Sequence, residues 1–372
     1  MKRVVLFFGI FLMIVGLVAQ MSVPPAQGDG SVANPYQIAI WQNLYWLSET
    51  ATEWDKNYFQ TADIDFADAD PAINTWDNNQ GWTPIGNSYR KFTGKYNGNN
   101  KTISGLFIYR PSVADQGFFG WSDNAGFENI GLINVNLAGS HRSGSLAAHN
   151  SDCNISHCYS TGMISGNPYY PVDCLGGMTG ANLGGSISHS YSSVCVKGFG
   201  GSVSYCYSTG NVSGTIYIGG LVGLNTGSIS HSYNTGNVNG SEKTGGLAGF
   251  NAGDSIMICY STGNVNGNYY TGGLIGYNDR GIINNSYSIG DVHGLEQDTG
   301  GLTGRNNQGL FTNCYSAGHV TGNDYTGGLA GVNCDRINNC FWDIETSGQT
   351  TSAGGTGITT LQMKMQLTYI NA

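Results

Sequence analysis

The sequence predicts an all-β fold, a right-handed parallel β-helix (β-solenoid) of about ten coils with a short N-terminal capping helix. The first observation is a phrase around an aromatic residue that returns every 26–28 residues from Tyr207 to Tyr315. The second is another phrase, G-[LM]-x-G-x-N, with a similar period. The third is composition: glycine supplies 58 of the 372 residues, and the repeats are rich in Ser, Thr, Asn and Val, which suit strands and turns better than helices.

The aromatic phrase predicts a strand with one face inward. The residues four before and five after the aromatic are apolar, as Ile229 and Val238 are around Tyr233. Because side chains alternate along a strand, Cys206 and Ser208 point inward and the aromatic residues point outward. The outward tyrosines are the predicted binding surface, since sugar rings could stack on them; the alternative is that they only stiffen the solenoid. They are Tyr207, Tyr233, Tyr260, Tyr287 and Tyr315.

The second phrase predicts an internal ladder of asparagines. The same alternation places the variable position of this phrase, for example Leu224 or Arg305, on the side of water. The asparagine of each copy then faces inward, where its amide can bond to the copies above and below. The ladder residues are Asn150, Asn182, Asn225, Asn251, Asn278, Asn306 and Asn333.

These phrases resemble the GLUG motif of bacterial secreted and surface proteins. The closest stretches are G-L-V-G-L-N at 220–225 and S-Y-N-T-G-N-V at 232–238. The runs at 35–49 and 92–108 are similar to the opening coils that precede GLUG repeats in such proteins. The resemblance implies a β-solenoid with an adhesin-like role at a cell surface, and it implies no particular chemistry.

The chain divides into five segments in order. Residues 1–19 begin with Lys2 and Arg3 and continue as an apolar run, which predicts a signal peptide cleaved after Ala19. Residues 20–34 are a linker by composition. Residues 35–116 form the N-terminal cap and first coils, with a helix in 39–49 where Ile40, Leu44 and Leu47 follow helical spacing. Residues 117–342 are the solenoid repeats, and 343–372 form a C-terminal cap or truncated coil. The protein is therefore expected to be secreted or at the cell surface.

Two copies are irregular. Between Tyr191 and Tyr207 the G-[LM]-x-G-x-N strand is missing, which predicts a truncated or bulged coil. Between Tyr159 and Tyr191 the chain carries an insertion, GNPYYPVDCLGG. Such excursions hold binding loops in many solenoids, but neutral drift in a surface turn is the simpler explanation and is favoured here.

Cysteines and metal-ligating residues offer weaker signals. Most cysteines of the aromatic phrase exchange with serine in the same inward position, which indicates small buried residues. Only Cys314 and Cys340 occupy that position on adjacent coils, so they are a possible disulfide. The acidic run from Asp63 to Asp70 fits no ordered calcium loop, and the histidines at 157 and 189 fit a polar turn position better than a metal site. We expect no metal and no cofactor.

Charge and residue placement bound the function. Without Lys2 and Arg3 the chain has 13 basic and 24 acidic residues, a net charge of −11, which argues against nucleic acid as a partner. Charged residues are 10% of the chain and lie at different places in different repeats, so no catalytic cluster stands out. We expect a non-enzymatic, monomeric structural or adhesive protein without a membrane span, binding a glycan or a cell-surface protein. The alternative is a polysaccharide lyase or hydrolase on a parallel β-helix.

Overall fold

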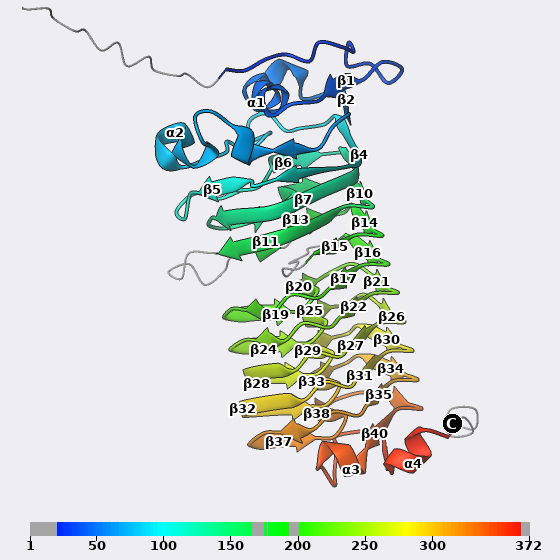
Figure 1. Ribbon diagram of the computed structural model, residues 1–372. Helices are drawn as coiled ribbons and strands as arrows, with labels where there is room; N and C mark the ends of the chain where they lie inside the picture. The colour runs from blue at the N-terminus through cyan, green and yellow to red at the C-terminus, as the bar shows by residue number, and fades with distance from the viewer. Residues whose placement is uncertain (1–20, 166–174, 177, 193–200, 366–372) are drawn as a thin grey trace, which may run out of the picture.

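The computed structural model describes residues 21–165, 175–176, 178–192 and 201–365. The predicted signal peptide and most of the insertion after Tyr159 lie outside these residues. The chain winds into a parallel β-solenoid whose coils stack along one axis, with the N-terminus at one end (Figure 1). The named strands of successive coils pair in parallel, and equivalent tyrosines face one another in register, as expected when each copy of a repeat lies on the next. Three of the longer pairings contain a register shift, for example between Gly267 and Tyr269. The predicted fold class is confirmed.

The first wall of the solenoid, called here the tyrosine sheet, is a 23-stranded sheet that runs along the whole molecule. Its strands are β1 (Tyr36–Ile38), β2 (Asn57–Gln60), β3 (Ile64–Asp65), β4 (Lys95–Ser104), β5 (Phe107–Tyr109), β7 (Gly126–Ala138), β10 (Asn154–Ser156), β11 (Tyr159–Ser165), β14 (Ser186–Ser188), β15 (Tyr191–Ser192), β16 (Ser202–Ser204), β17 (Tyr207–Ser208), β21 (Ile229–Ser230), β22 (Tyr233–Asn234), β26 (Ile256–Met257), β27 (Tyr260–Ser261), β30 (Ile282–Asn284), β31 (Tyr287–Ser288), β34 (Leu310–Thr312), β35 (Tyr315–Ser316), β39 (Ile337–Asn338), β40 (Phe341–Asp343) and β41 (Thr356–Ile358).

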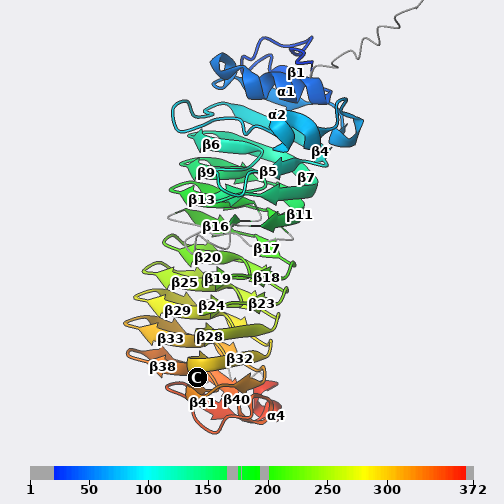
Figure 2. The ribbon, with the colours of Figure 1, turned by 90° about the vertical axis from the view of Figure 1, so that its left-hand side faces the viewer.

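The second wall, called the asparagine sheet, carries the G-[LM]-x-G-x-N phrase (Figure 2). It has three strands in the N-terminal part, β6 (Phe119–Asp123), β9 (Ala147–Ser151) and β13 (Thr179–Leu183), and five in the C-terminal part, β20 (Val222–Asn225), β25 (Ala248–Ala252), β29 (Ile275–Asp279), β33 (Thr303–Asn307) and β38 (Ala330–Asn333). In the described chain these eight strands mark about eight complete turns. The predicted number of about ten was slightly too high, because the first strands and the strands β16 and β17 join the tyrosine sheet without a described partner strand in the asparagine sheet.

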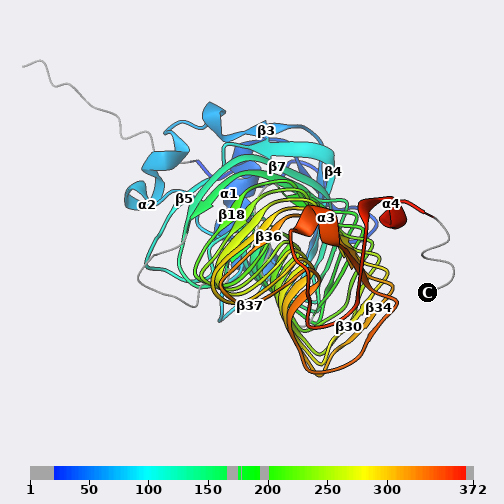
Figure 3. The ribbon, with the colours of Figure 1, turned by 90° about the horizontal axis from the view of Figure 1, so that it is seen from below.

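The third wall joins the other two. Its strands are β8 (Ser143–Gly144), β12 (Leu175–Gly176), β18 (Val212–Ser213), β19 (Ile216–Gly219), β23 (Val238–Asn239), β24 (Glu242–Gly245), β28 (Val265–Gly272), β32 (Val292–Gly300), β36 (Val320–Thr321) and β37 (Asp324–Gly327). Seen from below, successive coils have similar outlines that are displaced progressively along the stack (Figure 3).

The N-terminal end is covered by the predicted capping helix. Helix α1 (Trp41–Glu49) lies over the first coils (Figure 1). Its residues Leu44 and Leu47 are fully buried. Ile40 precedes the helix and is exposed, so only two of the three predicted apolar positions face the core. The other helical segments are η1 (Ala51–Glu53), η2 (Phe66–Asp68), η3 (Ile73–Thr75), α2 (Trp76–Asn79), α3 (Ile344–Ser347) and α4 (Thr360–Met363). Among the described residues no helix has the length and apolarity to cross a membrane.

The core changes character along the axis. In the first coils it is aromatic, with Tyr58, Tyr96 and Phe127 stacked in one file of paired strands. In the later coils the same positions are occupied mostly by β-branched residues such as Ile229 and Ile256. These residues are smaller than aromatic ones and pack well on the inner face of a sheet. One continuous apolar core therefore connects the capping helix to the last coils.

Candidate functional site

The predicted asparagines form a buried ladder inside the asparagine sheet. The amide Nδ2 of Asn225 donates to Oδ1 of Asn251 at 2.7 Å, and Asn251 donates to Asn278 at 2.7 Å. The ladder continues through Asn306 to Asn333 at 2.8 and 2.7 Å, and Asn150 donates to Asn182 at 2.6 Å in the N-terminal part. Several of these amides also donate to a backbone carbonyl in the following turn, as Asn251 does to Asp254 at 2.9 Å. This ladder satisfies internal polar groups, so its role is structural.

The predicted tyrosines form a continuous stack on the outside of the tyrosine sheet. Seven rings lie one above another from Tyr159 through Tyr191 and the five predicted residues to Tyr315, with centroids 4.7–5.1 Å apart and planes within 7° of parallel. Each tyrosine is half-buried between buried neighbours in its strand. At the N-terminal end the ring of Tyr159 covers Gly131, where an added Cβ would lie 2.5 Å from Cζ.

This geometry corrects the way in which the tyrosines were expected to bind sugars. Parallel rings at about 5 Å cover one another's faces, so within the stack only ring edges and phenolic hydroxyls reach the solvent. A sugar ring cannot lie flat on Tyr233 or Tyr260 without separating the stack. The faces of these rings stabilise the solenoid, and any ligand must meet the stack from its side.

A second file of side chains runs beside the tyrosine stack, two residues earlier in each copy. Its members have positive φ, from 48° at His231 to 55° at Asn313, which marks a corner in the coil. In the N-terminal half the file is aromatic: His157, His189, Tyr205 and His231 stack with centroids 4.6–5.0 Å apart. After His231 the file holds the exposed Ile258, and in the last coils it holds Asn285, Asn313 and Asn339. We call this file the corner file.

The change from rings to asparagines opens a groove. Where the corner file is Asn285, Asn313 and Asn339, a groove with a volume of about 310 Å³ lies between it and the tyrosine stack. Tyr287 and Tyr315 form the other side, together with Ser286 and Phe341. We call it the amide–aromatic groove. None of its seven residues has a carboxylate, amine, guanidinium or imidazole.

The asparagines of the groove are partly satisfied by one another. Nδ2 of Asn313 donates to Oδ1 of Asn285 at 3.1 Å, and Nδ2 of Asn339 donates to Oδ1 of Asn313 at 3.5 Å. All three side chains are exposed, and each amide has two donor hydrogens and two acceptor lone pairs. The file therefore keeps both donors and acceptors for a ligand in the groove.

A cluster of cations and aromatic rings lies on another edge, between the asparagine sheet and the third wall. Lys243 Nζ lies 5.0 Å from the ring centroid of Tyr217 and 5.5 Å from that of Tyr270. The guanidinium of Arg305 lies 5.1 Å from the ring centroid of Tyr270 and pairs with Asp298, which is fully buried. Lys243 likewise pairs with the carboxylate of Glu242, so the cations are internally compensated.

This cluster corrects one expectation about the variable position of the second phrase. Leu224, Phe250, Tyr277, Arg305 and Val332 were expected to face water, but Leu224 is buried and the other four are half-buried. Phe250 packs on the ring of Tyr217 and Tyr277 on that of Tyr270, both residues of the third wall. Arg305 pairs with Asp298 of the same wall. The sequence could have indicated this partial burial, because the position often holds a large ring or a paired cation where a fully solvated position would hold a small polar residue.

The same edge carries a histidine in the N-terminal part. The ring of His149 stacks on Trp121 with centroids 3.8 Å apart, and the guanidinium of Arg142 lies 5.5 Å from the Trp121 ring. Arg142 and Lys91 pair with the carboxylates of Asp115 and Asp123. Burial, followed by the nearby Arg142 cation, lowers the pKa of His149.

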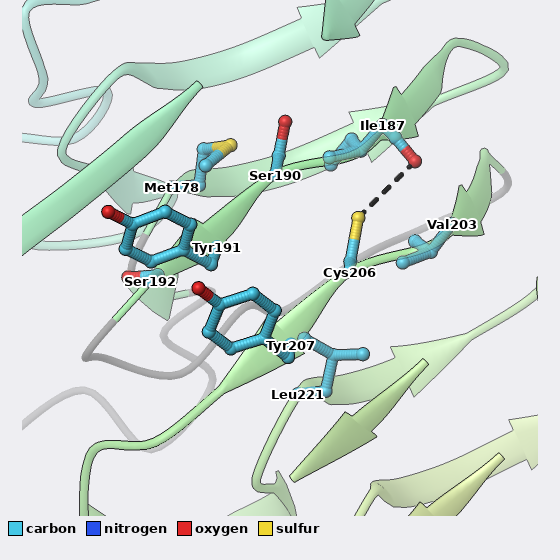
Figure 4. A pocket seen from close by; sticks show the side chains of 9 residues that line it. All are labelled: Met178, Ile187, Ser190, Tyr191, Ser192, Val203, Cys206, Tyr207 and Leu221. Carbon is cyan, nitrogen blue, oxygen red and sulfur yellow. Dashed lines mark hydrogen bonds between the residues drawn. The ribbon is translucent and has the colours of Figure 1, made fainter. Parts of the chain in front are cut away.

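A small apolar cavity lies at the truncated coil (Figure 4). It has a volume of about 10 Å³ and is bordered by Met178, Val203 and Leu221 among others, with Cys206 donating to the carbonyl of Ile187 at 3.5 Å. This volume holds about one water molecule. The cavity is a packing gap left by the shortened coil and is too small for a ligand.

The inward cysteines are small buried residues, and the predicted disulfide is absent. Cys314 and Cys340 are free thiols on adjacent coils, and the N–H of Cys314 donates to Sγ of Cys340 at 3.4 Å. Each thiol is also held by a carbonyl two residues earlier, at 3.2 and 3.1 Å. Burial raises the pKa of Cys158 to about 12 and that of Cys206 to about 11, so these thiols stay protonated.

The acidic run and the histidine pair have structural partners. Asp63 accepts the N–H of Thr102 at 2.8 Å, and Asp65 accepts the N–H of Ala67 at 2.9 Å. His157 and His189 belong to the corner file described above. Over the described ranges no group of three or more His, Cys, Asp or Glu side chains is arranged to hold a metal ion.

Comparison with known proteins identifies the repeat. The model of the GLUG motif family matches residues 214–239 and 267–292, which confirms the predicted resemblance at two of the repeats. Halomucin of Haloquadratum walsbyi is 32% identical over 173 residues, which are 45% of this chain and 2% of that protein. The chain thus spans a small fraction of this relative.

Two solved structures are similar in the path of the chain. One is a candidate immunoglobulin A1 protease from Bacteroides ovatus, with 17% identity, a TM-score of 0.42 and coverage of 92% of this chain and 89% of that one. Another is an IgA1 protease with 15% identity, a TM-score of 0.39 and coverage of 90% and 24%. Similarity at this level says nothing about the activity of this chain.

Proposed function

We propose that this GLUG-motif protein is an exported, non-catalytic β-solenoid that binds a glycan or a surface protein through the outside of its tyrosine sheet. The observation that carries the proposal is the amide–aromatic groove of about 310 Å³. The groove is open to solvent and lies on the outer face of the tyrosine sheet. Its side chains can donate and accept hydrogen bonds. Concave sites with a few convergent polar groups and aromatic walls are typical of ligand binding.

The chemistry of the groove supports binding without catalysis. Glycoside hydrolysis uses a pair of carboxylates, and general acid–base catalysis needs a group that takes up or releases a proton near neutral pH. The groove has asparagines, a buried serine and aromatic rings. Burial raises the pKa of Tyr287, so its phenol stays protonated in neutral solution.

The proposed location is the cell surface or the medium. The charged start and apolar run of residues 1–19 support export, and an acidic surface of net charge −11 after their removal supports solubility. A stack of parallel coils gives a rigid stalk, which suits a protein that holds a binding face away from its point of attachment.

The experiment is surface binding by the purified chain. Immobilised polysaccharides and fixed bacterial cells are titrated with the wild-type chain and with the double variant Tyr287→Ala/Tyr315→Ala. We expect saturable binding that falls at least tenfold in this variant. The control is Asn239→Ala/Asn266→Ala, which changes an exposed amide pair on the third wall, where Asn266 donates to Asn239 at 2.9 Å. An absence of binding by the wild-type chain, or an equal loss in both variants, contradicts the proposal.

A further inference from the structure

The amide–aromatic groove points to one class of ligand, and this inference rests on the proposed function. We infer that the groove binds an uncharged oligosaccharide that runs along the solenoid axis, and that the side-chain amides of Asn285, Asn313 and Asn339 form hydrogen bonds with its hydroxyl groups. Three observations support this inference: the groove has no charged side chain, its polar groups recur along the axis, and it lies where the corner residues are asparagines.

The absence of charged side chains in the groove selects against charged ligands. Its border consists of amides, aromatic rings and one buried hydroxyl. An acidic sugar would bring a carboxylate into a site without a cation, on an exported chain of net charge −11, and would lose hydration without gaining an ion pair. A neutral sugar loses less, because amides exchange hydrogen bonds with hydroxyls as water does.

The repeat of the polar groups favours a linear ligand along the axis. The three asparagines occupy the same position in successive coils, so their amides recur at the spacing of parallel strands, about 4.8 Å. The edges of Tyr287 and Tyr315 recur beside them at 4.8 Å. A chain of similar sugar units can repeat its hydroxyls along this direction, whereas a peptide would be expected to add to a free strand edge, and the strands of these coils are paired on both sides.

The size of the corner residue explains why the groove lies only in the C-terminal half. At the corner positions of the N-terminal half the rings of His189, Tyr205 and His231 stack beside the tyrosines, at centroid spacings of 4.9 and 4.6 Å. Asparagine is smaller than these rings and leaves the space open. The backbone is the same in both halves, since φ is 48° at His231 and 55° at Asn313. A histidine therefore fits the backbone at 313 and should fill the groove.

This exchange gives a matched pair of variants. Asn285→His/Asn313→His places in the groove the residues that the chain itself uses at 189 and 231, and His231→Asn removes a ring from the half without a groove. Thermal unfolding first checks that both variants fold. Calorimetric titrations then use the full chain with cellohexaose and xylohexaose as neutral probes and hexagalacturonate as an acidic probe.

We expect the wild-type chain to bind at least one neutral hexasaccharide and to bind hexagalacturonate at least tenfold more weakly. The groove-filling variant should lose at least tenfold in affinity, while His231→Asn should change it less than threefold. Equal binding of hexagalacturonate, no binding of either neutral probe, or full affinity in the folded groove-filling variant overturns the inference. If that variant still adheres to surfaces, the adhesive function stands and only the groove assignment fails; if the wild-type chain adheres to nothing, both fail.

Discussion

A single residue position decides the character of the outer face. The corner file keeps one backbone conformation along the molecule, yet its side chain changes from histidine or tyrosine through Ile258 to asparagine, and the groove lies where the side chain is asparagine. In the asparagine sheet the reverse holds, because the inward asparagine is kept in successive copies and its neighbours change. Positions that hold the same residue in successive repeats stabilise the solenoid, and positions that vary between repeats determine the character of its surface.

The inward asparagines should be the most sensitive polar residues of the repeats. Replacing Asn251 by Leu leaves the Nδ2 donor of Asn225 and the Oδ1 acceptor of Asn278 without partners in a buried place. We expect a loss of about 2–6 kcal/mol in the free energy of unfolding, since each of the two orphaned groups costs about 1–3 kcal/mol. Denaturant unfolding measures it.

The control for this prediction is an asparagine pair on the outer surface of the solenoid. Asn266 donates to Asn239 at 2.9 Å on the exposed side of the third wall, so Asn266→Leu should cost no more than about 0.5 kcal/mol. Equal losses in the two variants would show that burial of the ladder is not the source of its stability.

His149 should make stability depend on pH. Its pKa is lowered in the folded chain by burial and by Arg142, so the unfolded chain takes up this proton at a higher pH than the folded chain. Stability should therefore fall as the pH drops below the ordinary histidine value of 6.5. His149→Phe keeps a ring against Trp121 and should reduce this fall, measured as the change in unfolding free energy between pH 7.5 and 5. An identical pH dependence in the variant would exclude His149 as the source.

At the scale of elements, the truncated coil is the weak place in the stack. Between β15 and β17 the tyrosine sheet continues, with Tyr191 paired to Tyr207, but within the described residues the asparagine sheet breaks between β13 and β20. The third wall likewise divides into two sheets there. A coil held mainly by one wall should open locally more often than a complete one, because in a solenoid each coil is stabilised only by its neighbours.

Hydrogen exchange tests this weakness without any substitution. The N–H of Tyr207 donates to Ser190 at 3.3 Å, and the N–H of Tyr260 donates to Ser232 at 3.2 Å, so the two amides are equivalent in the repeat. We expect the Tyr207 amide to exchange at least tenfold faster under native conditions. Equal rates would mean that the shortened coil is as stable as a complete one.

The sequence predicted the strands well because their signals are local and repeated. Alternation around Tyr233 placed Ile229 and Val238 inside, and the capping helix followed from Leu44 and Leu47. The errors came from packing between neighbouring files. Leu224 was expected to face water, but it is buried, and at the equivalent position of the next coil Phe250 packs on Tyr217 of the third wall. The groove was also missed, because it depends on the size of Asn313 relative to His231 and not on either residue alone.

At the scale of the molecule, the solenoid is a rigid body with one outer face that differs along its length. The file of paired strands from Tyr36 to Ile337 places equivalent residues about 4.8 Å apart on every rung. The N-terminal half presents stacked rings, and the C-terminal half presents the amide–aromatic groove. This polarity suits a stalk that binds with one part and is held by another.

Binding without turnover is the central claim, and one measurement tests it most directly. The purified chain is incubated with a panel of insoluble polysaccharides, and the bound protein and the released sugar products are quantified in the same samples. We predict retention of the chain on at least one neutral polysaccharide with no release of reducing ends or unsaturated products over the buffer control. Product release that a single Asp or Glu substitution abolishes would contradict the claim and make the chain an enzyme.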